Sequence, residues 1–216
     1  MIKNLWVWTL KPTDIGNLIH LCEKEGIKNI FLSNKDTAMI NIFKNAGLKV
    51  DFLLGLAYPF TANDVLKECK NALSYGFDGI HLDLEGSNGA LDYQLSEAIS
   101  NLKLVLGEIP DIDIQCGQSS DKYFQAVNQC NSAHLMCYRK SAIGMYIFAK
   151  NVLSKIKIPF YVGFETSKTT EDISYYDLGK KVLDKQIFWA DLIFRLLYKN
   201  YKGVSIHYYE TYSQLK

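Results

Sequence analysis

The sequence alternates eight times between a short apolar run and a longer stretch in which apolar residues recur every three or four positions. Short apolar runs are typical of buried strands, and the longer spacing is typical of amphipathic helices. Repeated alternation in one chain predicts parallel strands covered by helices. Strands are expected at residues 5–10, 28–33, 49–56, 75–86, 112–117, 133–139, 159–166 and 203–209. Helices are expected at residues 13–26, 36–47, 61–76, 92–106, 120–129, 142–155 and 176–198.

Eight alternations in 216 residues predict a single (β/α)8 TIM barrel, an α/β fold that occupies residues 1–216 as one domain. The length is near the lower end of the range for this fold, which leaves little room for an inserted domain. A doubly wound open sheet is the alternative architecture. It normally has fewer strands and often a glycine-rich phosphate loop, and neither GxGxxG nor GKS/GKT occurs here.

The composition is that of an ordinary globular protein, with 48% hydrophobic residues, 22% charged residues and a formal net charge of +1. Lys and Arg are scattered along the chain, so no basic surface for nucleic acid or an anionic membrane is expected. The first 14 residues hold too short an apolar run for a signal peptide or a membrane span, and we therefore expect a cytoplasmic protein.

The chain has five cysteines in apolar or helical contexts and no C-x-x-C pair. An odd number without metal-ligand spacing predicts reduced, buried cysteines and no zinc site built from them. We expect no cofactor and no metal. The cysteines are Cys22, Cys69, Cys116, Cys130 and Cys137.

The segment YGFDGIHLDLEG, residues 75–86, has the period-two pattern of a strand with one apolar and one polar face. In a barrel the apolar face packs on the outer helices, so His81, Asp83 and Glu85 are expected to point into the interior. Glu85 is the last of them and falls at the C-terminal mouth, where barrel enzymes place their chemistry. His81 lies deeper, where we expect it to orient Asp83.

The same alternation of inward-facing and outward-facing side chains, applied to the other strands, predicts acids, amides and aromatic rings at the mouth. Carboxylates can donate protons and stabilise charge, polar groups can bind hydroxyls, and flat rings can stack on a pyranose. This combination predicts a carbohydrate site. The residues expected at the mouth are Trp8, Tyr58, Asp83, Glu85, Gln115, Tyr138, Glu165 and His207.

Two motifs carry a family resemblance. FDGIHLDLE resembles the fourth-strand signature D-G-x-D-x-D-x-E of family 18 glycoside hydrolases, the chitinases and endo-N-acetylglucosaminidases, with Asp78, Asp83 and Glu85 as three of its four acids. LMCYR resembles the Met-x-Tyr of the family's sixth strand, with Met136 and Tyr138. The family fold is a (β/α)8 barrel, and the resemblance covers the whole expected fold.

The resemblance implies a role for three residues. Glu85 would be the general acid that protonates the leaving oxygen, Asp83 would orient the acetamido group of the substrate and stabilise the charged intermediate, and Tyr138 would hydrogen-bond the same group. No protein nucleophile is needed, because the acetamido oxygen attacks the anomeric carbon. Substrate contacts are expected from Trp8, Tyr58, His81, Gln115, Arg139 and His207.

The sequence also departs from the family pattern. His81 replaces the second acid, Leu84 replaces the usual aromatic residue, and Arg139 replaces the polar or acidic residue after the tyrosine. The eighth strand has SIHYY, with His207, where the family usually supplies a tryptophan floor for the sugar.

Three alternatives stay open at the sequence level. In the first, Glu85 and Glu165 act as acid/base and nucleophile, which resembles the layout of clan A glycosidases, although Leu84 stands where their asparagine precedes the acid. Their carboxyl groups would be about 5–5.5 Å apart in a retaining enzyme and about 6.5–9.5 Å apart in an inverting one. The second alternative is a catalytically silent carbohydrate-binding barrel. The third is a metal-dependent hydrolase with ligands from His81, Asp83, Glu85, His134 and His207, although no His-x-His pair is present.

Overall fold

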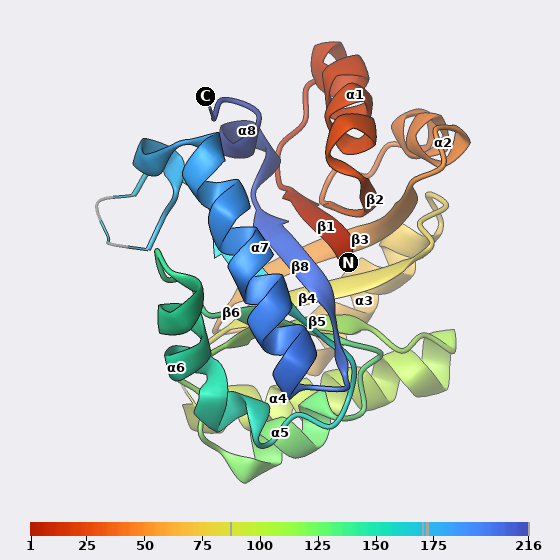
Figure 1. Ribbon diagram of the computed structural model, residues 1–216. Helices are drawn as coiled ribbons and strands as arrows, with labels where there is room; N and C mark the ends of the chain where they lie inside the picture. The colour runs from red at the N-terminus through yellow and green to blue at the C-terminus, as the bar shows by residue number, and fades with distance from the viewer. Residues whose placement is uncertain (87, 170, 172, 216) are drawn as a thin grey trace.

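The eight strands pair in parallel and in chain order, and the last pairs with the first, so the sheet closes into a barrel (Figure 1). A computed structural model describes residues 1–86, 88–169, 171 and 173–215. The strands are β1 (Ile2–Val7), β2 (Ile27–Leu32), β3 (Lys49–Ala57), β4 (Gly79–Glu85), β5 (Asp111–Gln115), β6 (Ala133–Met136), β7 (Phe160–Glu165) and β8 (Tyr201–His207). The predicted (β/α)8 barrel is confirmed.

Helices follow the strands and surround the barrel (Figure 1). They are α1 (Ile15–Glu25), α2 (Thr37–Asn45), α3 (Ala62–Leu73), α4 (Asn88–Asn101), α5 (Asp121–Val127), α6 (Ala142–Leu153), α7 (Lys180–Leu197) and α8 (Tyr209–Tyr212). Short 3-10 turns η1 (Pro12–Asp14) and η3 (Tyr176–Leu178) precede α1 and α7, and a π-helical turn η2 (Leu102–Leu106) extends α4. None of the helices in the described ranges combines the length and apolar character needed to cross a bilayer.

Two predicted strand positions are wrong in ways that move candidate residues. The first strand was expected at residues 5–10 but runs over Ile2–Val7, because Ile2–Leu5 pair with β8 and close the barrel. Trp8 therefore lies just beyond the strand end. The sixth strand was expected to reach residue 139 but ends at Met136, because the N–H of Cys137 turns back to the carbonyl of Leu135 (2.8 Å).

The alternation of outward-facing apolar and inward-facing polar side chains expected for β4 is confirmed. Ile80, Leu82 and Leu84 are buried in the main apolar cluster between the barrel and its helices, and His81, on the other face, is fully buried in the interior. Because both faces of a parallel sheet in this fold are covered, the polar row of β4 has only the barrel interior to occupy.

The barrel interior is filled by side chains that pack around Trp6, which is 1% exposed. The indole N–H donates to Asp113 Oδ2 at 3.0 Å, and Phe31 packs edge-on against the ring at a centroid distance of 5.4 Å. The rings of His81, His134 and His207 also meet the indole edge-on, at 5.6, 5.8 and 5.7 Å. One tryptophan thus contacts rings from β4 and β6 and from β8, the strand that neighbours its own.

Removing the indole N–H of Trp6 should lower the stability of the folded protein. Trp6→Phe leaves Asp113 Oδ2 without its donor and opens space in the interior, so the free energy of unfolding should fall by about 2–4 kcal/mol in urea titrations. Tyr93→Phe, at a side chain that is 69% exposed, is the control and should change little. A Trp6→Phe variant as stable as wild type would contradict the central role of this hydrogen bond.

Candidate active site

A pocket of about 390 Å³ opens at the C-terminal ends of the strands. The register of β3 on β4 sets Gly55 beside Asp83 and Ala57 beside Glu85. Because all the strands are parallel, their last side chains lie together at this end of the barrel. The pocket is lined by Trp8, Gly55, Leu56, Ala57, Asp83, Glu85 and His207.

A larger hollow, of about 600 Å³, lies outside the barrel between α1 and α8. Its polar side chains are mostly those of surface helices, with Lys11, Asp14, His20 and Lys24 among them. The mouth pocket is the better candidate site, because ionisable side chains from the ends of β4 and β8 converge there.

Trp8 forms one wall of the pocket and lies against Gly55. A Cβ at position 55 would come within 2.5 Å of the Trp8 ring, so only glycine fits under the indole. The Trp8 N–H donates to His207 Nε2 at 2.9 Å, which fixes the tilt of the ring. Gly55 was not among the residues expected at the site, although a glycine inside the apolar run LLGLA is a signal of close approach.

Both ring nitrogens of His207 have hydrogen-bond partners. Nδ1 lies 2.7 Å from Glu165 Oε2, and because Nε2 accepts from Trp8, the neutral ring carries its proton on Nδ1 and donates it to Glu165. Burial alone would lower the pKa of His207, but the hydrogen bond and charge of Glu165 outweigh it and raise the pKa above the usual range. Glu165, 5% exposed, also accepts from the N–H of Ser167 at 2.6 Å.

Asp83 is a half-buried acid at the bottom of the pocket. Its Oδ1 is enclosed and has no hydrogen-bond partner among the described residues. Burial, with the nearby carboxylates of Asp113 and Glu85, raises the pKa of Asp83 from 3.8 to about 7.

Glu85 ends β4 with an exposed side chain that lines the pocket. Its backbone carbonyl accepts from the N–H of Tyr58 at 2.8 Å, which ties the end of β4 to the β3–α3 connection. Within the described residues its carboxylate has no hydrogen bond or ion pair, so both oxygens are open to a ligand. Tyr58 is 47% exposed and lies at the rim.

Tyr138 lies next to this pocket, against His207, whereas Gln115 is not among the lining residues. The Tyr138 ring stacks on His207 with a centroid distance of 6.0 Å and an interplanar angle of 15°. Burial, together with the charge of Glu165, raises the pKa of Tyr138 well above its usual value. Gln115 ends β5 and is half-buried.

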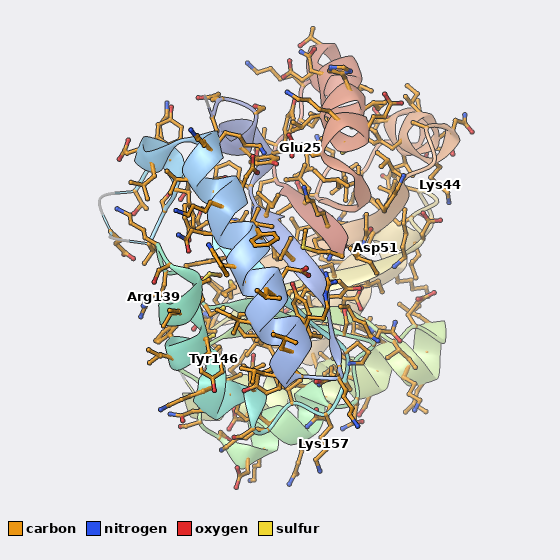
Figure 2. The ribbon with its side chains drawn as sticks, in the orientation of Figure 1. Glu25, Lys44, Asp51, Arg139, Tyr146 and Lys157 are labelled. Atoms are coloured by element: carbon orange, nitrogen blue, oxygen red, sulfur yellow. The ribbon has the colours of Figure 1, made fainter. Side chains whose placement is uncertain are left out.

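Two expected substrate-contacting residues lie elsewhere. Arg139 follows the end of β6 and turns outward: its guanidinium stacks on Phe148 of α6 at 3.6 Å, and Nη1 donates to the carbonyl of Tyr138 at 2.6 Å. Figure 2 shows Arg139 at the edge of the molecule, beside α6. His81 is fully buried beneath the pocket and stacks on Phe31 at 3.7 Å.

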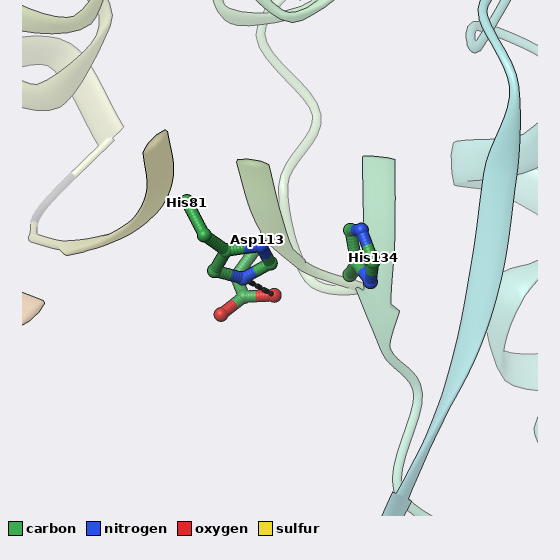
Figure 3. A group of neighbouring side chains, drawn as sticks. All are labelled: His81, Asp113 and His134. Carbon is green, nitrogen blue, oxygen red and sulfur yellow. Dashed lines mark ion pairs between the residues drawn. The ribbon is translucent and has the colours of Figure 1, made fainter. Parts of the chain in front are cut away.

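Beneath the pocket, His81, Asp113 and His134 bring potential ligand atoms within 4.8 Å of one another (Figure 3). His81 Nε2 lies 3.0 Å from Asp113 Oδ1. However, both ring nitrogens of His134 already face serine hydroxyls, at 3.2 Å from Ser132 Oγ and 2.7 Å from Ser205 Oγ. A metal ion would have to displace one of these bonds, so the donor set does not fit a preformed metal site.

The protonation states of this lower cluster agree with a packed interior. Burial lowers the pKa of His81 to about 4 and that of His134 well below its usual value. Burial also raises the pKa of Asp113 well above its usual value. Neutral groups avoid the cost of isolated charges in the barrel interior. Asp113, which was not among the residues expected at the site, accepts the Trp6 hydrogen bond at the centre of this cluster.

The raised pKa of Asp83 predicts a pH-dependent stability. The folded protein binds the Asp83 proton more tightly than the unfolded chain, so ionisation of Asp83 lowers the free energy of unfolding as the pH rises from about 4 to about 7. Asp83→Asn cannot ionise, and its stability relative to wild type should increase over that range and then level off. Urea titrations at a series of pH values measure this difference; a difference that is constant with pH would contradict the raised pKa.

The comparisons with known proteins concern the fold. No family model matches the sequence, and no curated protein matches it. Solved structures do match: the ICChI chitinase of Ipomoea carnea has a TM-score of 0.66 at 14% identity, covering 98% of this chain and 95% of that one. The xylanase and α-amylase inhibitor XAIP-II of Scadoxus multiflorus has a TM-score of 0.67 at 12% identity, covering 98% and 94%.

A third match is the YdjI aldolase of Escherichia coli K12, with a TM-score of 0.52 at 14% identity over 97% of this chain and 75% of that one. A glycosidase, an inhibitor and an aldolase therefore share this barrel. At such identities the likeness is one of fold, and the resemblance to the chitinase barrel is confirmed at that level.

Proposed function

We propose that this protein is a glycoside hydrolase that acts on an oligosaccharide in the mouth pocket, with Glu85 as the proton donor. The observation that carries the proposal is the position of Glu85, an exposed carboxylate at the end of β4 without a hydrogen-bond or ion-pair partner among the described residues, above the half-buried Asp83 and facing the Trp8 wall. An acid beside a second carboxyl and an aromatic surface is the arrangement that glycoside cleavage requires.

In the proposed reaction Glu85 donates its proton to the glycosidic oxygen as the bond to the anomeric carbon breaks. On a 2-acetamido sugar, as the family 18 resemblance implies, the acetamido oxygen bonds to the anomeric carbon. Asp83 accepts a hydrogen bond from the acetamido N–H and stabilises the positive charge. Water then attacks the anomeric carbon and displaces the acetamido oxygen, which restores the acetamido group, and Glu85 takes up the proton of that water.

Glu165 serves in this proposal as a positioning residue. Both of its carboxylate oxygens accept hydrogen bonds and its side chain is 5% exposed, which does not favour a nucleophile that must reach the anomeric carbon. Its effect passes through His207 to Trp8, the ring that would stack on the sugar. The geometry therefore supports the acetamido-assisted mechanism more than the two-glutamate mechanism.

A second candidate is a carbohydrate-binding protein without turnover. It is favoured by His207 in the place of the family's tryptophan floor. It predicts that the pocket binds sugars and that Glu85 contributes only to affinity.

Hydrolysis of a panel of aryl glycosides, with N-acetylglucosaminides included, tests the proposal. Glu85→Gln keeps the shape of the side chain but has no proton to donate, so kcat should fall about 10²–10⁴-fold. Glu97→Gln, at an exposed acid of α4, is the matched control and should retain full activity.

The outcomes separate the two candidates. Turnover by wild type that Glu85→Gln abolishes, with oligosaccharide binding retained in calorimetry, supports the hydrolase. Binding without turnover in wild type would overturn it in favour of the binding protein.

The positioning role of Glu165 has its own measurement. Glu165→Gln removes the carboxylate that raises the pKa of His207, so this pKa should fall below its wild-type value in an NMR titration of the imidazole. The remote variant Glu97→Gln should leave it unchanged. An unaltered His207 titration in Glu165→Gln would show that Glu165 does not act through the histidine.

A further inference from the structure

Helix α7 has apolar residues on two opposite sides. Leu183, Ile187, Ala190 and Phe194 are buried against the barrel. A second set points to solvent: Val182 is 36% exposed, Trp189 44%, Leu192 39% and Leu196 76%. In Figure 1, α7 crosses the front of the molecule, with nothing over it.

The exposed set follows a coiled-coil spacing. Val182, Trp189 and Leu196 are seven residues apart, and Leu192 falls at the intermediate position of the second heptad. Apolar residues at this spacing form a seam that fits another helix. Lys185 occupies the intermediate position of the first heptad, where its long stem can cover apolar surface while its amine stays in water.

The neighbouring helix α6 extends this surface. A hollow of about 400 Å³ between the two helices is lined by Ile143 of α6 and by Trp189 and Ile193 of α7. Ile143 is 64% exposed, and Phe188, on the other flank of the seam, is 62% exposed. We call this surface the α6–α7 face. Its residues are Ile143, Val182, Phe188, Trp189, Leu192 and Leu196.

We propose that the α6–α7 face binds a second copy of this chain, forming a two-fold symmetric dimer in which two α7 helices pack antiparallel. A two-fold axis places the same surface on both sides of the contact. With the axis between Lys185 and Trp189, each lysine comes beside the indole of the other copy, which favours a cation–π contact.

The size of the face matches a dimer interface. The exposed fractions of its six residues correspond to roughly 600 Å² of apolar surface, at the upper limit of the largest patch on typical monomers. A standard interface buries about 800 Å² per partner, of which about two thirds is apolar in homodimers. The α6–α7 face can therefore supply the apolar area that one partner of a stable dimer contributes.

The charges at the ends of α7 agree with antiparallel packing. Lys181 and Lys185, both exposed, lie in the N-terminal half. The C-terminal end carries the negative pole of the helix dipole, and the exposed Arg195 there is already paired with Asp191. Antiparallel helices bring the lysines of one copy toward the negative pole of the other, whereas parallel helices would bring the two lysine pairs together.

The dimer leaves the proposed active site free. The α6–α7 face is on the outer ring of helices, and none of its residues lines the mouth pocket. A variant that no longer dimerises can therefore keep its hydrolytic activity, and a variant that no longer hydrolyses substrate can still dimerise.

Sedimentation velocity of the full chain over a range of micromolar concentrations tests the proposal. Wild type should sediment as a dimer, and Leu196→Glu should weaken self-association at least about tenfold, because it places charge in the seam. Trp189→Lys is a second variant with the same expected effect. Leu104→Glu, at a leucine of η2 that is 82% exposed, is the matched control and should leave the dimer intact.

Circular dichroism of each variant confirms that it is folded, which the exposure of these side chains predicts. A wild type that is monomeric at every concentration would overturn the proposal, as would a dimer that neither Leu196→Glu nor Trp189→Lys weakens. A monomeric Leu196→Glu variant that keeps wild-type hydrolysis would confirm that the face and the mouth pocket are separate.

Discussion

The hydrogen bond from the Trp6 indole to Asp113 is the interaction on which the barrel interior depends. A carboxyl group that is 3% exposed needs a partner, and the indole N–H supplies it at 3.0 Å from the other side of the barrel. The same ring fills the space between His81, His134 and His207. The same side chain therefore fills the interior and supplies the hydrogen bond to Asp113 Oδ2, and the strands that carry these groups pack around it.

Above the side chains packed around Trp6, the pKa values of the ionisable groups differ from one layer of the barrel to the next. His81 and His134 are kept neutral by burial, whereas Glu165 raises the pKa of His207, which lies one layer higher. Asp83, which lines the mouth pocket together with His207, has a pKa of about 7. The barrel thus keeps neutral groups in its interior and has ionisable groups with raised pKa values near its mouth, which is the arrangement that the proposed hydrolase would use.

The fold by itself does not choose the chemistry. The same barrel is found in a chitinase, an inhibitor of other enzymes and an aldolase, so function depends on the side chains at the strand ends. Here these are Glu85, Asp83, Trp8 and His207, and the proposed hydrolase rests on their arrangement. The apolar α6–α7 face is a separate property of the outer helices.

The sequence by itself determined the barrel and the interior row of β4, because period-two and helical spacings are local and eight of them suffice to close a sheet. It also predicted Trp8, Asp83, Glu85 and His207 at one end of the barrel, since the C-terminal ends of parallel strands meet there. Only the tertiary structure decided where β1 and β6 end, because closure with β8 and the turn at Cys137 set those limits. For the same reason Arg139 turns outward to Phe148, and the partners of Asp113 and Gly55 appear only when distant strands are packed together.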